Sequence, residues 1–432
     1  MPATMSLETV YTLAVDQAPS LAIARYRSEA AKEQSAEARG AVLPQLSLFG
    51  EWSENTVNYD GPLAAIYGEQ DYPGERYGFQ ARQTLFNMSQ FREVQRRDAL
   101  FDRSESDLAQ AEIELLAQVA NGYLTVLDAD HTVSQFKVES EALEKQLEEA
   151  QALYLRSLLP LTQVLETQTR SETVKADLIE AEGDAAIARE RLTELIGIRD
   201  FELMGIAEGV ALTARLTNPE QAVAEALQNS PAVAAARESA EAAEFAIKRE
   251  KGSWWPEVSL IFNQQYSDVG FDNLTSPPRT VESVSIAVNY PLIQGGAGAA
   301  RIRGAWAEYY ASKEELEGVK REVETQTRSA WVRLRASNKR IIAAQQALDT
   351  ANVNVSAAQK SVKAGTARVT DVLFALAQRT RAQRDRFFAE QQRIMAWLEL
   401  ELITGSAPAA VVPVLSDALL STAAVTATAT GQ

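Results

Sequence analysis

The chain has 432 residues, of which 46% are hydrophobic and 23% are charged, a balance typical of a folded protein that is not built from membrane-spanning helices. Its 59 acidic and 42 basic residues give a formal net charge of −17, which argues against nucleic acid as a partner, because phosphate backbones need a basic surface. With no cysteine and a single histidine, His131, the sequence excludes thiol chemistry, cysteine-ligated zinc and any catalytic triad not built on His131.

The N-terminus shows no export signal. Glu8 and Asp16 stand where a signal peptide would have its apolar core, so we expect that any signal has been removed from this sequence. No apolar stretch approaches the roughly 18 residues of a membrane-spanning helix. The lack of cysteine suits an oxidising compartment, where stray thiols would mispair.

The chain contains an internal repeat. Residues 18–48 align without a gap with residues 230–260 at an offset of 212, which matches Pro19 with Pro231. We therefore predict two copies of one structural unit. The predicted divisions are a first repeat, a linker or equatorial segment, a second repeat and a low-complexity C-terminal tail, over residues 1–198, 199–217, 218–406 and 407–432.

Each copy is predicted to contain a helix, two strands, a long helix and a return helix. The opening helix covers about residues 7–40, and its counterpart covers about residues 218–252. Residues 409–432 are rich in Ala, Thr and Val without a clear period, so we expect a mostly disordered tail there.

Two strand hairpins follow the opening helices. The first pairs Leu43–Asn55 with Arg76–Phe86, and the second pairs a strand near Val258 with Val281–Leu292. Apolar and polar side chains alternate along these strands with a period of two, which predicts one apolar and one polar face. The candidate barrel segments, with their flanks, cover residues 42–87 and 254–293.

Very long helices come next, and heptad spacing of their apolar residues indicates coiled-coil packing. A helix over about residues 88–155 holds some 68 residues, or roughly 100 Å at 1.5 Å per residue. The opening helix and a return helix over about residues 162–197 together match this length. We therefore expect two short helices to stack end to end along one long helix.

Four strands with one apolar face cannot close a barrel, and an open sheet would expose its edges and its apolar surface. Several chains would solve this by pooling strands. Two chains give eight strands, whose interior side chains would fill, and three give twelve, which are wide enough for a lumen. A barrel facing lipid needs this apolar exterior and polar interior. The alternative is a soluble periplasmic coiled-coil scaffold or adaptor protein.

Short motifs stand in a specific order within the repeat. They are Leu43-Pro44-Gln45-Leu46 with its copy Trp255-Pro256-Glu257-Val258, Thr84-Leu85-Phe86-Asn87, Tyr290-Pro291-Leu292-Ile293-Gln294-Gly295-Gly296 with Arg301 downstream, and Gly365-Thr366-Ala367-Arg368-Val369-Thr370-Asp371-Val372-Leu373. Together with the repeat, these motifs resemble the TolC family of outer membrane factors over roughly residues 5–406.

The resemblance implies a homotrimeric membrane protein of the α+β class. Each chain would give four strands to a twelve-stranded outer-membrane β-barrel that continues into an α-helical barrel, the periplasmic tunnel. A periplasmic adaptor (membrane fusion protein) and an inner-membrane transporter of the RND, ABC or MFS type would dock at the converging helix tips and open them. The implied location is the outer membrane of a Gram-negative bacterium, in contact with its lipid and without a nucleic-acid partner.

The resemblance also implies a constriction at the helix tips. The expected constriction or gate residues are Asp371, Phe374, Thr162, Gln163 and Arg368. Three copies of Asp371 near one axis would attract cations. The other interpretation of Asp371 is an acid that stabilises a helix N-terminus. Phe374 occupies a position where the family often has a second acid, and the family's interlocking arginine is shifted by one position, to Arg368.

The tips are also the expected docking surface for the adaptor and the transporter. The residues concerned are Arg156, Ser157, Leu158, Leu159, Gly365 and Thr366. For His131, in the middle of a long helix, we expect a surface position. Trp52, Trp254 and Trp255 suit either an aromatic belt at a membrane boundary or core packing.

These patterns predict an outer-membrane exit duct of a tripartite efflux pump or a type I secretion system. Such a duct would passively conduct substrates from the periplasm to the exterior and would be gated at its helix tips. The sequence contains no plausible catalytic constellation, so we expect no enzymatic activity, no cofactor and no metal.

Overall fold

The structure is a computed structural model that describes residues 3–59, 61–63, 66, 68–206, 212, 215–216, 218–270, 273–364 and 366–420. It divides into two compact units. The helical unit comprises residues 1–25, 106–234 and 318–432, and the sheet unit comprises residues 26–105 and 235–317. Among the described residues, every helix lacks the combination of length and apolar character needed to cross a membrane.

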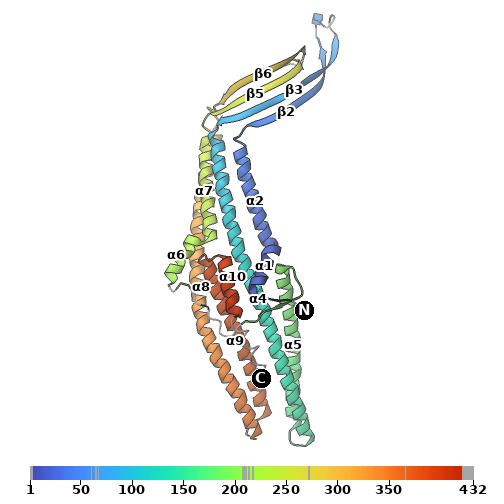
Figure 1. The fold of residues 1–432 in the computed structure, drawn as a ribbon, viewed down its shortest axis with the longest axis vertical. Helices are drawn as coiled ribbons and strands as arrows, with labels where there is room; N and C mark the ends of the chain where they lie inside the picture. The colour runs from blue at the N-terminus through green and yellow to red at the C-terminus, as the bar shows by residue number, and fades with distance from the viewer. Residues whose placement is uncertain are drawn as a thin grey trace. The chain divides into compact units, whose positions relative to one another are not determined.

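The elements follow the predicted order of helix, strands, long helix and return helix in both halves of the chain (Figure 1). In the first half they are β1 Ala3–Met5, α1 Leu7–Gln17, α2 Pro19–Gly40, β2 Gln45–Asn58, the short 3-10 helix Gly61–Leu63, β3 Glu69–Phe86, α4 Met88–Leu155, α5 Leu161–Ile196 and β4 Phe201–Leu203. In the second half they are α6 Pro219–Asn229, α7 Pro231–Gly252, β5 Glu257–Val269, β6 Thr275–Asn289, α8 Ala297–Lys363, α9 Val369–Ile403 and α10 Pro408–Leu420.

The opening helix of each half is broken, which corrects the prediction of one continuous helix. α1 ends before Ala18, and α6 ends before Ser230, and both of these residues have extended backbone angles. The next residue in each case is a proline, Pro19 or Pro231. The proline ring disfavours the helical conformation in the residue before it, so the chain turns and a new helix starts with proline at its first position.

The sheet unit is built on one antiparallel sheet with the strand order β2-β3-β5-β6. The two hairpins meet where β3 pairs with β5. At Gly78 of β3, an added Cβ would lie 2.0 Å from the carbonyl oxygen of Gln264, so only glycine fits this close approach. β3 and β6 begin earlier than the sequence predicted, at Glu69 and Thr275, because antiparallel pairing extends through polar residues that composition alone assigns to loops.

Ion pairs connect the helices of the sheet unit. Glu93 of α4 accepts hydrogen bonds from Arg96 and Arg97 of the same helix and from Arg249 of α7. Glu250 of α7 accepts a hydrogen bond from Arg301 of α8. Burial raises the Glu93 pKa, but the hydrogen bonds from Arg96 and Arg249 outweigh it and bring the pKa down to about 2. This carboxylate is therefore charged throughout the physiological range and keeps three guanidinium groups together.

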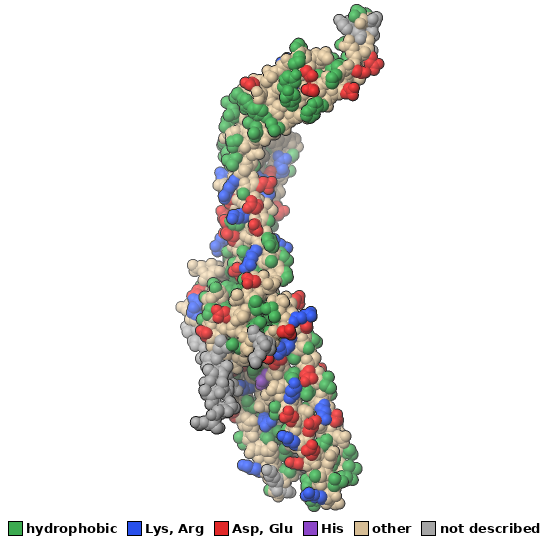
Figure 2. All heavy atoms as spheres, turned by 45° about the vertical axis from the view of Figure 1, so that its right-hand side comes forward, with side chains coloured by type: hydrophobic (Ala, Val, Ile, Leu, Met, Phe, Trp, Pro, Cys, Tyr) green, Lys and Arg blue, Asp and Glu red, His purple; other side chains and the backbone are tan. Residues whose placement is uncertain are grey.

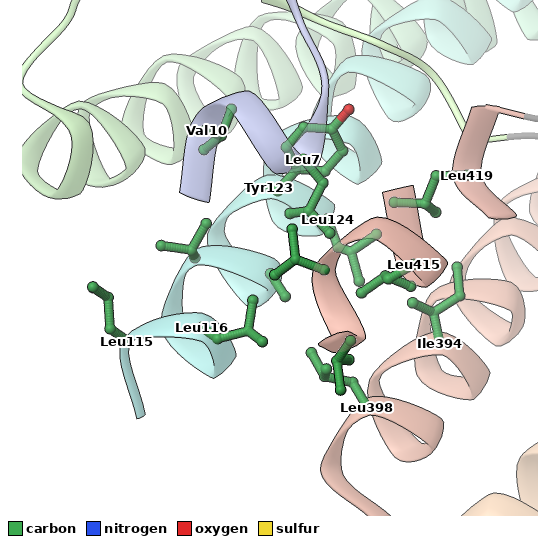
Figure 3. Close-up of a cluster of buried hydrophobic side chains, with 14 of the residues drawn as sticks. Leu7, Val10, Leu115, Leu116, Tyr123, Leu124, Ile394, Leu398, Leu415 and Leu419 are labelled. Atoms are coloured by element: carbon green, nitrogen blue, oxygen red, sulfur yellow. The ribbon is translucent and has the colours of Figure 1, made fainter. Parts of the chain in front are cut away.

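The main hydrophobic core lies in the helical unit, where α1, α4, α9 and α10 pack together with residues of α5 and α8 (Figure 3). Its labelled members come from α1, α4, α9 and α10 and are Leu7, Val10, Leu115, Leu116, Tyr123, Leu124, Ile394, Leu398, Leu415 and Leu419. The Tyr123 hydroxyl donates to the carbonyl oxygen of Met204 at 2.6 Å, and burial raises the pKa of this phenol. β1 pairs in parallel with β4 beside this core, which ties the N-terminal segment to the chain that follows α5.

Two helical hairpins complete the helical unit: hairpin 1 (α4 and α5) and hairpin 2 (α8 and α9). In hairpin 2, Val355 of α8 packs on Val372 and Leu376 of α9, as the predicted heptads require. The hairpins meet where Leu143 of α4 and Val174 of α5 pack on Leu373 of α9.

Residues 408–420 form α10, which corrects the prediction of a mostly disordered tail for this part of the chain. The buried members of α10, Val411, Val412, Leu415 and Leu419, recur with helical spacing and pack into the main core. The Ala- and Val-rich composition hid this period. Residues 421–432 of the predicted tail lie outside the described residues.

The role of α10 is testable with a matched pair of variants. Leu415 is fully buried, whereas the adjacent Val414 is 54% exposed. Leu415→Ala should lower the free energy of unfolding by about 2–5 kcal/mol, because it removes core contacts and leaves a cavity. Val414→Ala should change it by less than about 0.5 kcal/mol. Denaturant unfolding followed by far-UV circular dichroism measures both, and equal effects would mean that α10 does not belong to the core.

Candidate functional site: the two-faced sheet and the hairpin tips

The register sorts the side chains of the sheet onto two chemically different faces. Directly paired residues share a face of the sheet. One row across all four strands is apolar and consists of Leu46, Ala81, Phe262 and Val284. The adjacent row points to the opposite face and is polar, with Ser47, Gln80, Asn263 and Ser283. The predicted alternation is therefore present in every strand.

The apolar face is open to solvent in the single chain. Leu48 of β2 is 82% exposed and Ile286 of β6 is 65% exposed. Figure 2 shows hydrophobic side chains gathered over part of the sheet. An exposed apolar surface of this kind marks a place that another protein or a membrane covers.

Aromatic side chains lie at both ends of the apolar face. Near one end, Tyr77 stacks on Tyr266 with ring centroids 4.8 Å apart, and Trp52 lies on the same face. At the other end, the Phe86 ring lies 6.2 Å from Trp255. Trp52 is 73% exposed, so core packing within the chain does not explain it, and aromatic belts at both ends suit a surface between two water boundaries.

The polar face is held by charged hydrogen bonds across its strands. Arg82 of β3 donates to Glu257 of β5 at 3.0 Å, and Arg76 of β3 donates to Glu51 of β2 at 3.3 Å. These pairs satisfy the charges without apolar cover, so this face is suited to water.

The tip of hairpin 1 is a tight turn that presents leucines. Ser157 adopts a left-handed conformation with φ of 60°, and the Leu158 N–H donates to the Leu153 carbonyl at 2.9 Å, which closes the end of α4. Leu155 is 82% exposed and Leu158 is 68% exposed. The end of hairpin 1 therefore presents apolar side chains to solvent in the single chain.

The tip of hairpin 2 is closed by polar contacts. The Thr366 N–H and hydroxyl both donate to the Ser361 carbonyl, at 2.9 and 3.1 Å. Arg368 is the N-cap of α9, and its N–H donates to the Asp371 carboxylate at 2.8 Å. Asp371 thus stabilises the N-terminus of α9, as its helix-dipole interpretation requires, and its side chain is exposed.

Different faces of α9 pack on different neighbours. Val372 and Leu376 pack on α8, while Leu373 packs on hairpin 1. Asp371 and Phe374 are three residues apart and lie on the remaining, exposed face, where Phe374 is 64% exposed. The predicted charge and the predicted aromatic ring therefore share one surface of the chain.

The other predicted tip residues occupy the ends of the hairpins. Thr162 and Gln163 lie in the first turn of α5. Arg156 and Ser157 are exposed beside the leucines, and Leu159 is partly buried. Gly365 lies outside the described residues.

Sequence reasoning missed two features. The first is the stack of Tyr77 on Tyr266 at one end of the apolar face, which was detectable because both are aromatic residues at apolar positions of the alternation. His131, expected at the surface, is instead half-buried and stacks on Phe387 of α9, with ring centroids 4.2 Å apart and planes at 7°. No sequence spacing signals this contact, because it joins two helices far apart in the chain.

A model of the outer membrane efflux protein family matches residues 10–198 and 222–406. The chain belongs to this family. The two matched segments leave residues 1–9, 199–221 and 407–432 outside.

Curated relatives of this efflux protein cover nearly its full length. The alkaline protease secretion protein AprF of Pseudomonas aeruginosa is 25% identical over 403 residues, which are 91% of this chain and 83% of AprF. The outer membrane protein TolC of Vibrio cholerae is 25% identical over 406 residues, which are 93% of this chain and 91% of TolC.

Solved structures have the same fold. Crystal structures of CusC match with a TM-score of 0.81 at 16% identity, covering 94% of this chain and 93% of that one. The outer membrane protein VceC of Vibrio cholerae matches with a TM-score of 0.78 at 20% identity, covering 92% and 96%.

These findings confirm the predicted family, the outer-membrane location and the function as an exit duct. They do not favour the soluble scaffold. The family is one of transport channels rather than of enzymes.

The two faces of the sheet are testable with adjacent residues of β6. Ile286→Lys places a charge on the apolar face and should cost about 2–4 kcal/mol on insertion into a bilayer, which lowers the yield of folded protein in lipid vesicles. Ser285→Lys, on the polar face, should insert nearly as well as the unmodified protein. A gel-mobility assay of folding into vesicles measures both yields. Equal losses for the two variants would contradict the assignment of the faces.

Proposed function

We propose that three copies of this chain form the exit duct of a tripartite efflux pump or a type I secretion system. The observation that carries this proposal is the two-faced sheet with open edges. In the described part of the chain, β2 and β6 end the sheet, and neither has a strand on its outer side. Backbone groups at such an edge cannot stay unpaired in a bilayer, so β2 must pair with β6 of a neighbouring chain.

The number of copies follows from the polar face. Two copies would close eight strands, whose interior has room only for side chains. Three copies close twelve strands and leave a water-filled lumen lined by residues such as Arg76, Gln80 and Arg82. The apolar face with its aromatic belts then meets lipid, which is the arrangement of outer-membrane barrels.

The helical hairpins supply the gate in this proposal. Three copies of Asp371 and Phe374 would form an acidic and an aromatic ring at the periplasmic constriction, because these residues share the exposed face of α9. Thr162, Gln163 and Arg368 complete the constriction.

The leucine-bearing tip of hairpin 1 and the tip of hairpin 2 would receive the periplasmic adaptor and the inner-membrane transporter. The docking residues remain Arg156, Ser157, Leu158, Leu159, Gly365 and Thr366. The exposure of Leu155 and Leu158 supports a protein partner with an apolar surface at this point.

The name of AprF states secretion of alkaline protease, and the family description states efflux. The proposal for this chain includes both secreted proteins and efflux substrates as cargo. A passive duct requires walls and a gate but no binding site for one cargo. A passive duct of this kind needs no catalytic residues.

The trimer and its conductance are tested together. Detergent-extracted protein should have a mass near three times 47.2 kDa and should give discrete, small conductance steps in a planar bilayer, because the tips restrict a wide lumen. A detergent-free monomer that forms no channels would overturn the proposal.

The charge at Asp371 is separable from its capping role. Asp371→Asn keeps an acceptor for the Arg368 N–H but removes the charge, so it should reduce cation selectivity and block by divalent cations while leaving the closed conductance small. Asp371→Ala loses both roles and should also lower stability by about 0.5–2 kcal/mol. Single-channel recordings with and without Mg²⁺ measure the charge effect. Unchanged selectivity and unchanged block in both variants would remove Asp371 from the constriction.

A further inference from the structure

The only histidine in the sequence occupies a contact between the two helical hairpins. His131 of α4 stacks almost flat on Phe387 of α9, with ring centroids 4.2 Å apart. Its Nδ1 is buried without a hydrogen-bond partner, and its Nε2 lies 3.4 Å from the Gln135 amide nitrogen. The imidazole therefore acts here mainly as a flat apolar ring that covers a phenyl ring.

This stack is one of several contacts between hairpin 1 and α9, which also pack together at Leu373 and in the main core. One turn further along α9, the Gln391 side chain donates to the Leu124 carbonyl of α4 at 2.8 Å. In the direction of the tips, the Arg384 guanidinium lies 5.3 Å from the Phe136 ring of α4. His131 sits between these two contacts, so a change in its charge acts on the region that joins the hairpins.

The charges around His131 disfavour a proton on it. The α9 residues Arg384 and Arg386 are both on the facing helix, and Arg386 also donates to Gln345 of α8. Burial first, and then these two arginines, hold the His131 pKa below its ordinary value of 6.5.

The nearby acidic groups do little to stabilise a positive charge on His131. Asp130 binds Arg189 of α5 at 2.6 Å, and Glu390 binds Arg393 at 2.6 Å. Asp128, one turn before His131 on α4, has its pKa raised by burial and lowered by Arg384, so it faces one of the same guanidinium groups. An imidazolium at position 131 would thus face two guanidinium groups with few free carboxylates.

We propose that the stack of His131 on Phe387 is a pH-sensitive clamp that holds hairpin 2 against hairpin 1 at neutral pH and loosens when His131 is protonated. The clamp rests on the proposed function in one respect, which is that separated hairpins correspond to an open tip. Its contacts and its titration belong to the chain itself.

The direction of the effect follows from proton linkage. Separated hairpins leave His131 near its ordinary pKa of 6.5, whereas the clamped state holds the pKa lower. Above pH 6.5 both states carry a neutral imidazole and the clamp is intact. Below that value the ratio of separated to clamped protein rises by up to about tenfold for each pH unit, until His131 becomes protonated within the clamped state as well.

The first test is a direct titration. Because the chain has one histidine, protein labelled with ¹⁵N-histidine and purified without a histidine tag gives a single pair of imidazole signals. The clamp requires a His131 pKa below 6.5, and Phe387→Leu should shift it back toward 6.5, because the covering ring is lost. An ordinary pKa in the unmodified protein, unaffected by Phe387→Leu, would overturn the proposal.

The second test measures the separation of the hairpins. The chain has no cysteine, so Leu155→Cys on hairpin 1 and Lys360→Cys on hairpin 2 carry the only spin labels, and both positions are exposed. Dipolar spectroscopy on the assembled protein should show longer distances at about pH 5.5 than at about pH 7.5. His131→Phe keeps a ring against Phe387 without a titratable group and should give the same short distances at both values.

A matched variant separates His131 from its acidic neighbour. Asp128→Asn removes a half-buried carboxylate one turn from His131 and should leave the pH response in place. Loss of the response in Asp128→Asn, or its persistence in His131→Phe, would assign the switch to another group and overturn the clamp.

Conductance of the same variants separates the clamp from the duct. If the protein conducts and the unmodified chain opens more at low pH while His131→Phe does not, the clamp controls the tips. Distances that change with pH in a protein that forms no channels would keep the clamp and refute the duct. Distances and conductance that are both independent of pH in a conducting protein would refute the clamp and keep the duct.

Discussion

The outer edges of β2 and β6 impose the constraint on which the rest of the structure depends. A lipid bilayer offers no water to unpaired backbone groups, so a sheet of four strands with two open edges is incompatible with the outer-membrane location of this family. In the proposed assembly, pairing between copies removes both edges at once. The apolar face stays uncovered within one chain. The helices of the sheet unit are joined to one another by ion pairs such as Glu93 with Arg249, and in the proposed assembly they leave this face free for lipid.

The internal repeat gives the chain two copies of this arrangement, and the two copies differ at their hairpin tips. Both copies keep the proline that splits the opening helix and the alternation that separates the sheet faces. At the tips the copies differ in chemistry. Hairpin 1 ends in leucines around a left-handed Ser157, whereas hairpin 2 ends in the polar turn that leads to Asp371. In the proposed assembly this difference assigns protein docking mainly to one hairpin and ion selectivity to the other.

The sequence was sufficient for features that depend on local periodicity, and it failed where a property depends on contacts between distant segments. The alternation from Leu46 to Trp52 and the heptads around Val355 predicted the faces of the sheet and the packing of hairpin 2. The Ala- and Val-rich residues of α10 showed no such signal, since their helix is stabilised by the core formed by α1, α4 and α9. The stack of His131 on Phe387 was equally hidden, because pairing across 256 positions (387 − 131) leaves no local pattern.

The contacts along α9 connect these observations to gating. At its first turn, Asp371 is bound to the Arg368 backbone, so the charge of the proposed constriction moves with the helix and not as a free side chain. One face of α9 packs on α8 through Val372 and Leu376, which makes hairpin 2 a stiff pair. α9 contacts hairpin 1 through Leu373, Phe387 and Gln391, and nearer its C-terminal end it packs on α4 in the main core. The proposed clamp lies on this second interface, between the main core and the tips, so protonation of the half-buried His131 would loosen the part of α9 that leads to Asp371.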